Sequence, residues 1–403
     1  MRPAAADVRK AVTGRLGETV SLLDRLIGYP TVSADSNLDL VSDLAQRLED
    51  CGARVDLFQD GSGRKANLFA TMGPDGPGGV VLSGHTDVVP VTDQDWASDP
   101  FEMRQADGRL YGRGACDMKG FIAASVVAAQ DYARMSLKRP VHFSFTYDEE
   151  IGCLGARALV PELQRRGIQP AMAIIGEPTD MRVIEGHKGC CEYTVRFSGL
   201  EGHGSAPGRG VNAAEYAVRY VSRLMSLRGE LMLRAPQGSR FDPPWTTLNI
   251  GRISGGVAHN VIAGKAEVDW EMRPVQDGDA DFVKRDIERY VTTQLLPAMR
   301  AICANADITT EVLGEVAGLE VMPENAARDL VAGLVGANGA DVVPFGTEAG
   351  LFQAMGMSVV VCGPGSIDQA HKPDEFVSLD QLQSCLGMLD RLGRSFALTG
   401  GLA

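Results

Sequence analysis

The sequence lacks the features that mark several specialised classes of protein. No apolar run approaches the roughly 20 residues that a membrane-spanning helix needs, and the polar start, residues 1–16, has no signal-peptide core. The eight cysteines show no C-x-x-C spacing, which fits free thiols in a reducing compartment. A net charge of −13 disfavours nucleic acids and anionic membranes, because both select clustered Lys and Arg. We therefore expect a cytoplasmic protein with neither kind of partner.

The composition is that of an ordinary globular protein. Hydrophobic residues make up 44% of the chain and charged residues 23%, so neither a disordered nor a fibrous class fits. At 403 residues the chain is too long for one ordinary core, and a prior of roughly 150 residues per domain suggests two or three units. We expect two.

The hydrophobic pattern changes character along the chain. Early strands such as Val141–Tyr147 are almost continuously apolar, as expected when helices cover both faces of a sheet. From Cys190 apolar and polar residues alternate, which indicates strands with one solvent-facing side. These later segments follow the order strand, helix, strand, strand, helix, strand, which is the split β-α-β unit. We predict an α/β domain formed by residues 1–186 and 316–403, interrupted by a smaller α+β domain at 187–315.

Potential metal ligands follow four strands of the predicted α/β domain. The strands and their residues are Val80–Leu82 with His85 and Asp87, Val141–Tyr147 with Asp148, Glu149 and Glu150, Ala171–Ile175 with Glu177, and Ser358–Cys362 with His371 in a glycine-rich loop. In open α/β sheets, binding sites form beyond the carboxyl ends of the strands. We therefore expect these side chains to share one pocket.

The candidate ligands are too many for a single four-coordinate ion. They are two imidazoles and three carboxylates: His85, His371, Asp117, Glu150 and Glu177. If Asp117 bridges, His85 and Glu177 complete one ion and His371 and Glu150 complete another, with a shared water as the fourth ligand of each. Imidazole with carboxylate suits zinc or cobalt better than magnesium. The sequence thus predicts two divalent metal ions, Zn²⁺ first and Co²⁺ as the alternative.

Two further carboxylates have distinct predicted roles. Asp87 lies two residues beyond His85, where it can accept the other imidazole N–H and fix the ring. Adjacent extended residues point apart, so Glu149 stays free when Glu150 binds metal, and Glu149 is the candidate general base. Each motif alone has an ordinary interpretation as a turn, and only their joint placement favours a metal site. His142 is predicted to be a core residue and His259 a surface one.

In these segments the sequence resembles the co-catalytic zinc family of aminoacylases, carboxypeptidases and N-acyl amino acid deacylases. The resemblance is nearly full-length and runs in order through Ser83–Pro90, Tyr111–Gly114, Asp117–Gly120, Asp148–Glu150 and Gly176–Pro178. It implies a zinc-exopeptidase-like catalytic domain with a helix-flanked mixed sheet, and the ligand roles given above with Asp117 bridging and Glu149 as base. It also implies a cis peptide bond after Asp117.

Within that family the motifs are most similar to those of the acetylornithine deacetylases. The segment Gly346–Ala349 stands where succinyl-diaminopimelate desuccinylases are expected to carry Thr-Ser-Asp-Gly. The resemblance implies hydrolysis of N2-acetyl-L-ornithine to L-ornithine and acetate, a step of arginine biosynthesis. Two alternatives stay open: another N-acyl amino acid deacylase, such as the desuccinylase, a deformylase or a broad aminoacylase, and a metal-stabilised binding protein without catalysis.

The inserted domain is similar to the family's ferredoxin-like lid, which also forms homodimers by edge-strand pairing. The resemblance assigns His203 to stabilising the oxyanion, in its own subunit or across the dimer, and Asn260 and Arg273 to substrate contacts. Arg273 could form a bidentate pair with an α-carboxylate. His203 in its glycine-rich loop and Arg273 before Pro274 could also both be ordinary surface residues. The family usually has Gly-His-Ser-Ser here, so Gly204 is expected to loosen the loop around His203.

Overall fold

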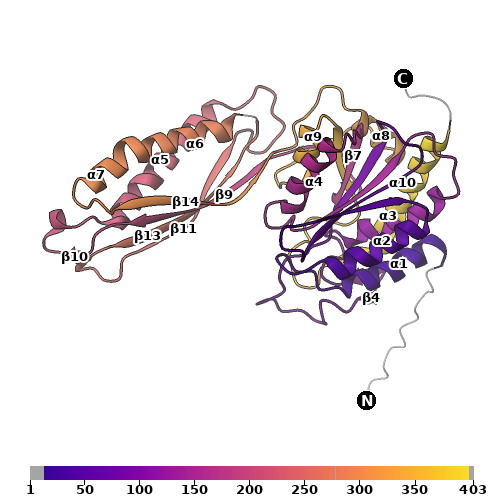
Figure 1. The fold of residues 1–403 in the computed structure, drawn as a ribbon, viewed down its shortest axis with the longest axis horizontal. Coiled ribbons are helices and arrows are strands. Elements are labelled where there is room, and N and C mark those ends of the chain that lie inside the picture. The colour runs from indigo at the N-terminus through magenta and orange to yellow at the C-terminus, as the bar shows by residue number, and fades with distance from the viewer. Residues whose placement is uncertain (1–12, 277, 399–403) are drawn as a thin grey trace, which may run out of the picture. The chain divides into compact units, whose positions relative to one another are not determined.

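The computed structural model describes residues 13–276 and 278–398, which form two compact units (Figure 1). The first unit contains the chain up to Ile184, Pro323–Asp341 and the part from Phe352 onward; the second contains Glu185–Met322 and Val342–Leu351. Among the described helices, none is both long enough and apolar enough to cross a membrane.

A mixed eight-stranded sheet runs through the first unit, and most residues of two of its strands, β8 and β15, are assigned to the second unit. Its strand order is β1-β2-β6-β3-β7-β16-β8-β15. The bounds are β1 Arg54–Gln59, β2 Ala66–Met72, β3 Val80–His85, β6 Val141–Thr146, β7 Met172–Pro178, β8 Ile184–His187, β15 Asp341–Val343 and β16 Ser358–Gly363. The four central strands β6, β3, β7 and β16 are parallel, and β1, β2 and β8 pair antiparallel. The carboxyl ends of the parallel strands therefore meet at one edge of the sheet.

Helices flank this sheet on both faces. Alternate strand residues such as Leu82, Phe143 and Ile174 are buried in one core with five helices, and α4 lies on the other side of the sheet (Figure 1). The helices are α1 Gly14–Ile27, α2 Leu38–Asp50, α3 Lys119–Tyr132, α4 Leu154–Arg165, α8 Ala326–Val335 and α10 Leu379–Ala397, and the short α9 spans Ala349–Ala354. Three short strands, β4 Arg104–Ala106, β5 Arg109–Tyr111 and β17 Phe376–Ser378, form a separate small sheet. Sequence patterning did not predict this small sheet.

The second unit has the split β-α-β topology. Its four-stranded antiparallel sheet has the order β11-β13-β9-β14. The elements are β9 Cys190–Ser198, α5 Ala213–Leu233, β11 Thr247–Gly255, β13 Lys265–Arg273, α6 Asp279–Tyr290, a π-helical turn Val291–Leu295, α7 Leu296–Arg300 and β14 Asp307–Val316. A two-stranded sheet, β10 Gly202–His203 with β12 Val261–Ile262, and the 3-10 turn Pro207–Arg209 complete it. The predicted fold class, α/β with a ferredoxin-like α+β insertion, is confirmed.

Alternation along β13 explains why this second sheet has one polar face. Val268 and Trp270 are buried against the helices, whereas Glu267 and Asp269 on the other face pair with arginines of neighbouring strands. The first unit illustrates the contrast, because every residue of β3 and β6 is buried. His142 in β6 is a core residue that stacks on Phe69, as predicted. His259 is exposed, also as predicted.

Three short segments lie outside the domain division predicted from the sequence. Residues 185–186, 316–322 and 342–351 were assigned to the α/β domain but belong to the second unit. The backbone of Gly350 lies so close to the carbonyls of Ala317 and Gly318 that a Cβ there would meet them at 2.3–2.5 Å. Thr347 also bonds His187 through its hydroxyl, 2.9 Å from Nε2. These contacts join segments far apart in sequence, which patterning cannot detect.

Candidate metal centre

The parallel strands bring the predicted ligands to one edge of the first unit's sheet. His85 is the last residue of β3, and Glu177 lies near the end of the neighbouring β7. Glu149 and Glu150 follow β6, the other neighbour of β3, whose Thr146 is the register partner of His85. The strand β7 runs further than expected and includes Glu177. Gly176 has to be glycine, because a Cβ there would lie 2.0 Å from the Phe121 ring.

One group of ligands surrounds the imidazole of His85. Its Nε2 lies 2.9 Å from Oδ1 of Asp117 and 3.8 Å from Oε1 of Glu177. All three side chains are buried. Asp117 comes from the turn that precedes α3, and the peptide bond after it is cis, as the resemblance implied.

A second group faces the other oxygen of Asp117. Nε2 of His371 lies 3.3 Å from Oδ2 of Asp117 and 3.0 Å from Oε2 of Glu150. His371 belongs to the loop between β16 and β17 and is half exposed, whereas Glu150 is nearly covered. Asp117 thus presents one oxygen to each imidazole. Two imidazole nitrogens and three carboxylates in this arrangement form a donor set that fits two divalent ions.

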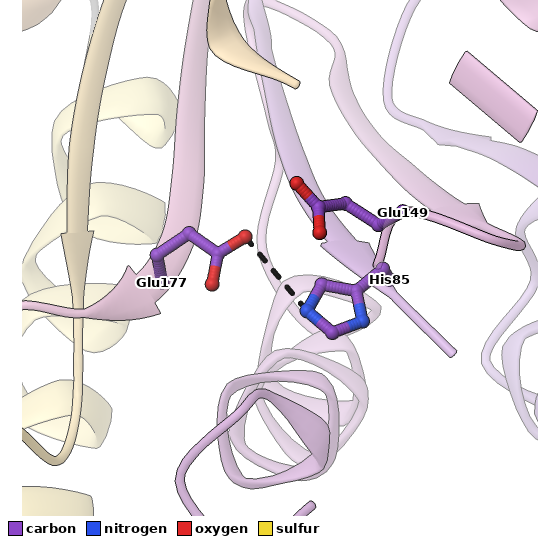
Figure 2. Close-up of side chains that lie close together, drawn as sticks. All are labelled: His85, Glu149 and Glu177. Atoms are coloured by element: carbon purple, nitrogen blue, oxygen red, sulfur yellow. Dashed lines mark ion pairs between the residues drawn. The ribbon is translucent and has the colours of Figure 1, made fainter. Parts of the chain in front are cut away.

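Glu149 lies beside the first group without an ion pair to it. Figure 2 shows its carboxylate near His85 and Glu177, and ligand atoms of the three residues lie within 4.8 Å of one another. Burial and the carboxylates of Glu150, Asp87 and Asp117, opposed by His85, raise the pKa of Glu149 to about 8. The thiol of Cys153 donates to its Oε1 over 3.4 Å. Without cations nearby, this carboxyl therefore holds a proton at neutral pH.

The other pKa shifts reflect the same excess of negative charge. Burial raises the pKa of Glu177 well above its usual range, and burial together with Asp117 raises that of Glu150. Hydrogen bonds to Asp117 and Glu150 raise the pKa of His371 to about 10. Burial opposes the charged form of His85, yet Glu177 and Asp117 still raise its pKa well above the usual value. Bound cations would relieve this repulsion and take the place of the protons.

The residues from β3 to α10 match a known sequence family. The profile described as peptidase family M20/M25/M40 matches residues 81–394, most of the chain. The chain belongs to this peptidase family.

Solved structures of several peptidases share the fold at low sequence identity. An M20 family metallo-carboxypeptidase from Sulfolobus solfataricus is 17% identical with a TM-score of 0.76, covering 94% of this chain and 99% of that one. An aminopeptidase from Bacillus cereus is 18% identical with a TM-score of 0.71, at 96% and 100% coverage. A dinuclear metal binding peptidase of the M20 family from Bacillus subtilis is 17% identical with a TM-score of 0.64, at 95% and 98% coverage.

In this M20 family member, Asp87 contacts both the imidazole of His85 and the acidic turn after β6. Nδ1 of His85 lies 2.9 Å from the main-chain carbonyl of Asp87 and 3.5 Å from its carboxylate, so the carbonyl is the closer acceptor. The carboxylate accepts hydrogen bonds from the backbone N–H groups of Glu149 and Glu150, at 3.0 and 3.3 Å, and from the Ser33 hydroxyl at 2.7 Å. Asp87 therefore positions both the imidazole and the acidic turn. The sequence predicted that the carboxylate of Asp87 accepts the imidazole N–H, whereas the main-chain carbonyl is the closer acceptor, and the contacts with the acidic turn and Ser33 were not predicted.

One supporting ion pair was missed by sequence reasoning. Lys65 and Asp148 are buried and paired, and Asp148 also accepts from the backbone N–H of Ala34 at 3.1 Å. Asp148 immediately precedes Glu149, so this pair fixes the start of the acidic turn. No local sequence pattern predicts that Lys65 is buried, because it follows a polar, glycine-rich turn of a kind that is usually exposed to solvent.

The three predicted substrate residues all lie in the second unit, and two of them are neighbours. His203 in β10 pairs with Val261 of β12, and the backbone N–H of Gly204 donates to the carbonyl of Asn260 at 2.7 Å. Arg273 is the last residue of β13, whereas β12 precedes the first residue of that strand. The Arg273 guanidinium donates to the carboxylate of Glu271 at 2.7 and 3.0 Å.

The expected loosening of the loop at Gly204 was wrong. A Cβ at this position would lie 2.9 Å from the carbonyl of Asn260, so glycine instead allows the two backbones to approach closely. The absence of a side chain here tightens the pairing of His203 with its neighbouring strand.

Proposed function

We propose that this M20 family member is a two-metal amide hydrolase that releases acetate from N2-acetyl-L-ornithine. The observation that carries the proposal is the placement of Asp117, whose two oxygens face His85 and His371 separately while Glu149 lies alongside. His85, Asp117 and Glu177 would hold one ion. His371, Asp117 and Glu150 would hold the second, Zn²⁺ or Co²⁺ in each case.

The chain's own residues then perform the proton transfers. When bound, the ions supply a Lewis acid for the amide carbonyl and lower the pKa of the attacking water. Glu149 takes a proton from that water as its oxygen bonds to the acyl carbon, and returns the proton to the nitrogen as the C–N bond breaks. Acetate and the free amine leave. Arg273 would exchange Glu271 for the α-carboxylate of the substrate. Because His203 lies near the opposite end of β13 from Arg273, His203 of the partner subunit would donate a hydrogen bond to the developing oxyanion across a dimer.

The choice of acetylornithine depends on motif resemblance in Thr347–Ala349. In the structure Thr347 and Glu348 are buried in the second unit, and Thr347 also accepts from the backbone N–H of Ala349 at 3.0 Å. The segment is thus buried and hydrogen-bonded within that unit. This supports our use of it as a marker of the acetylornithine deacetylase subgroup. Its main competitor is another deacylase that uses the same chemistry on a different acyl group.

A substrate panel tests this function. We expect kcat/KM on N2-acetyl-L-ornithine to exceed that on succinyl-diaminopimelate and acetylmethionine by at least about tenfold, because a site fitted to one side chain discriminates on that scale. Steady-state rates of zinc-loaded and cobalt-loaded protein provide the comparison. Faster turnover of the succinyl substrate would make the chain a desuccinylase. Two bound ions with no hydrolysis of any N-acyl amino acid would favour a binding protein.

We further propose that the second unit mediates a homodimer through β11 and α5. β11 is an edge strand of its sheet, and Ile253 within it is exposed. On α5, Val218, Met225 and Met232 are 57%, 53% and 48% exposed and recur every seven residues, so they share one face of the helix. An apolar stripe beside an open strand edge suits a partner that covers both.

Met225→Glu is expected to dissociate this dimer. A symmetric interface would bury two unpaired carboxylates, and because each costs several kcal/mol the dissociation constant should rise at least about 100-fold. Sedimentation velocity over a range of concentrations measures it. Leu313→Glu, on the opposite edge strand β14 with a similarly exposed side chain, serves as the matched control. A dimer lost in the control and kept in Met225→Glu would place the interface on the other edge.

A further inference from the structure

The buried carboxylate of Glu375 anchors the turn that carries Asp117. Its Oε1 accepts the backbone N–H groups of Cys116 at 2.9 Å and Asp117 at 3.1 Å. Its Oε2 accepts the N–H of Gly114 at 3.0 Å and Nη1 of Arg113 at 2.8 Å. Three of these four hydrogen bonds come from the main chain next to the candidate bridging ligand. Glu375 therefore sets where the Asp117 backbone lies.

Arg113 continues the network away from Glu375. Its guanidinium is buried, donates to Oε1 of Gln94 at 2.5 Å and to the carbonyl of Lys372 at 3.3 Å, and lies 5.0 Å from the centre of the Trp96 ring. A planar guanidinium can make several such bonds in fixed directions at once. Arg113 thus ties the loop around Gln94 to the loop that contains Lys372.

Gln94 completes a connection to the other metal ligand on this side. Its Nε2 donates to the main-chain carbonyl of His371 at 2.9 Å, while its Oε1 accepts from Arg113 and from Nε1 of Trp96. His371 has a left-handed backbone with φ of 62°, a conformation that non-glycine residues keep only when their surroundings hold it. The His371 side chain is half exposed, and its ion-pair partners are Asp117 and Glu150.

We propose that Gln94, Arg113 and Glu375 form a positioning relay that holds Asp117 and His371 in register for the second metal ion. The inference rests on the proposed two-ion centre. None of the three side chains is a proposed ligand. They act through the backbone of the ligand-bearing residues, in the way that residues behind a metal site orient its ligands.

A purely structural role does not account for the arrangement. A buried ion pair such as Arg113 with Glu375 is weak support for stability, since desolvation offsets much of its attraction. Gln94 is only partly buried, and ordering its side chain costs conformational entropy. What the three residues share is that their hydrogen bonds end on the main chain beside two metal ligands.

The test compares stepwise zinc binding by variants at Gln94. Metal-free full-length protein is titrated with Zn²⁺ against a chromophoric chelator, and His371→Ala identifies which binding step belongs to the His371 ion. Gln94→Ala should weaken that step by about tenfold or more, the usual cost of losing a residue that orients a ligand, and leave the other step within about threefold. Gln94→Glu keeps an acceptor for Arg113 but loses the donor to His371, so it should weaken the same step equally.

Two further variants separate positioning from folding. Gln46→Ala removes an exposed glutamine that bonds Asp50 on α2 and should bind both ions like the wild type. Glu375→Gln should weaken both zinc-binding steps, because Asp117 is a proposed ligand of both ions. The unfolding temperature of the metal-free Gln94 variants should match that of the metal-free wild type. If the wild type binds two ions and both Gln94 variants do so with equal affinity, the relay is wrong while the proposed function stands. A wild type that cannot bind two ions overturns both.

Discussion

Glu149→Ala is expected to keep two bound metal ions and to lose turnover by about 10²-fold or more, the scale of a lost general base. Glu149 makes no ion pair with the ligands, so its removal leaves His85, Asp117 and Glu177 in place. The measurements are kcat on N2-acetyl-L-ornithine and metal content by elemental analysis. Normal turnover in the variant would remove Glu149 from the mechanism.

Matched variants make the test of Glu149 more specific. Glu162→Ala removes a partly exposed glutamate of α4, the helix that follows the acidic turn, and should leave turnover unchanged. Glu149→Gln keeps the shape and the contact with Cys153 but cannot exchange a proton, so it should be as inactive as the alanine variant. An active glutamine variant would show that Glu149 contributes shape rather than proton transfer.

Asp117→Ala is expected to lose both ions and at least about 10³-fold in turnover. Asp117 is the carboxylate that faces both imidazoles, so its loss removes a ligand from each ion. Two-metal sites lower the activation barrier by several kcal/mol, and each 1.4 kcal/mol is a factor of about ten in rate. Metal content and kcat of protein purified in parallel with the wild type are the readouts.

Comparison with the outer ligands identifies Asp117 as the shared one. Glu177→Ala and Glu150→Ala should each weaken mainly one ion, since Glu177 pairs with His85 and Glu150 pairs with His371. Asp56→Ala, which removes an exposed partner of Arg166 on β1, is the control for loss of a carboxylate and should retain both ions. Retention of two tightly bound ions by Asp117→Ala would contradict the bridging role.

Much of the centre could be predicted because its ligands follow regular elements. The apolar runs of β3, β6 and β7 identify buried parallel strands, and such strands end at one edge, so His85, Glu150 and Glu177 could be brought together from periodicity alone. Asp117 and His371 lie in turns, and their assignment depended on ligand counting and on motif resemblance. The second unit's topology could likewise be predicted from alternation, as in β13.

The remaining features depend on contacts between irregular segments. Lys65 reaches Asp148 across 83 residues, and Gln94 reaches His371 across 277, in loops whose residues have no periodic signal. The tight pairing at Gly204 was predicted in the wrong direction, because a glycine's role depends on what approaches it. The assignment of residues 342–351 to the second unit was missed for the same reason.

By itself the sequence determined which residues are candidates for the chemistry and which strands present them, because side-chain periodicity and strand order are local properties of the chain. Only the tertiary structure decided how the candidate ligands are distributed around the two oxygens of Asp117, which carboxylate lies beside His85 and Glu177, and which buried side chains hold the turns in place. Those features depend on distances between distant loops, and a linear pattern contains no measure of such distances.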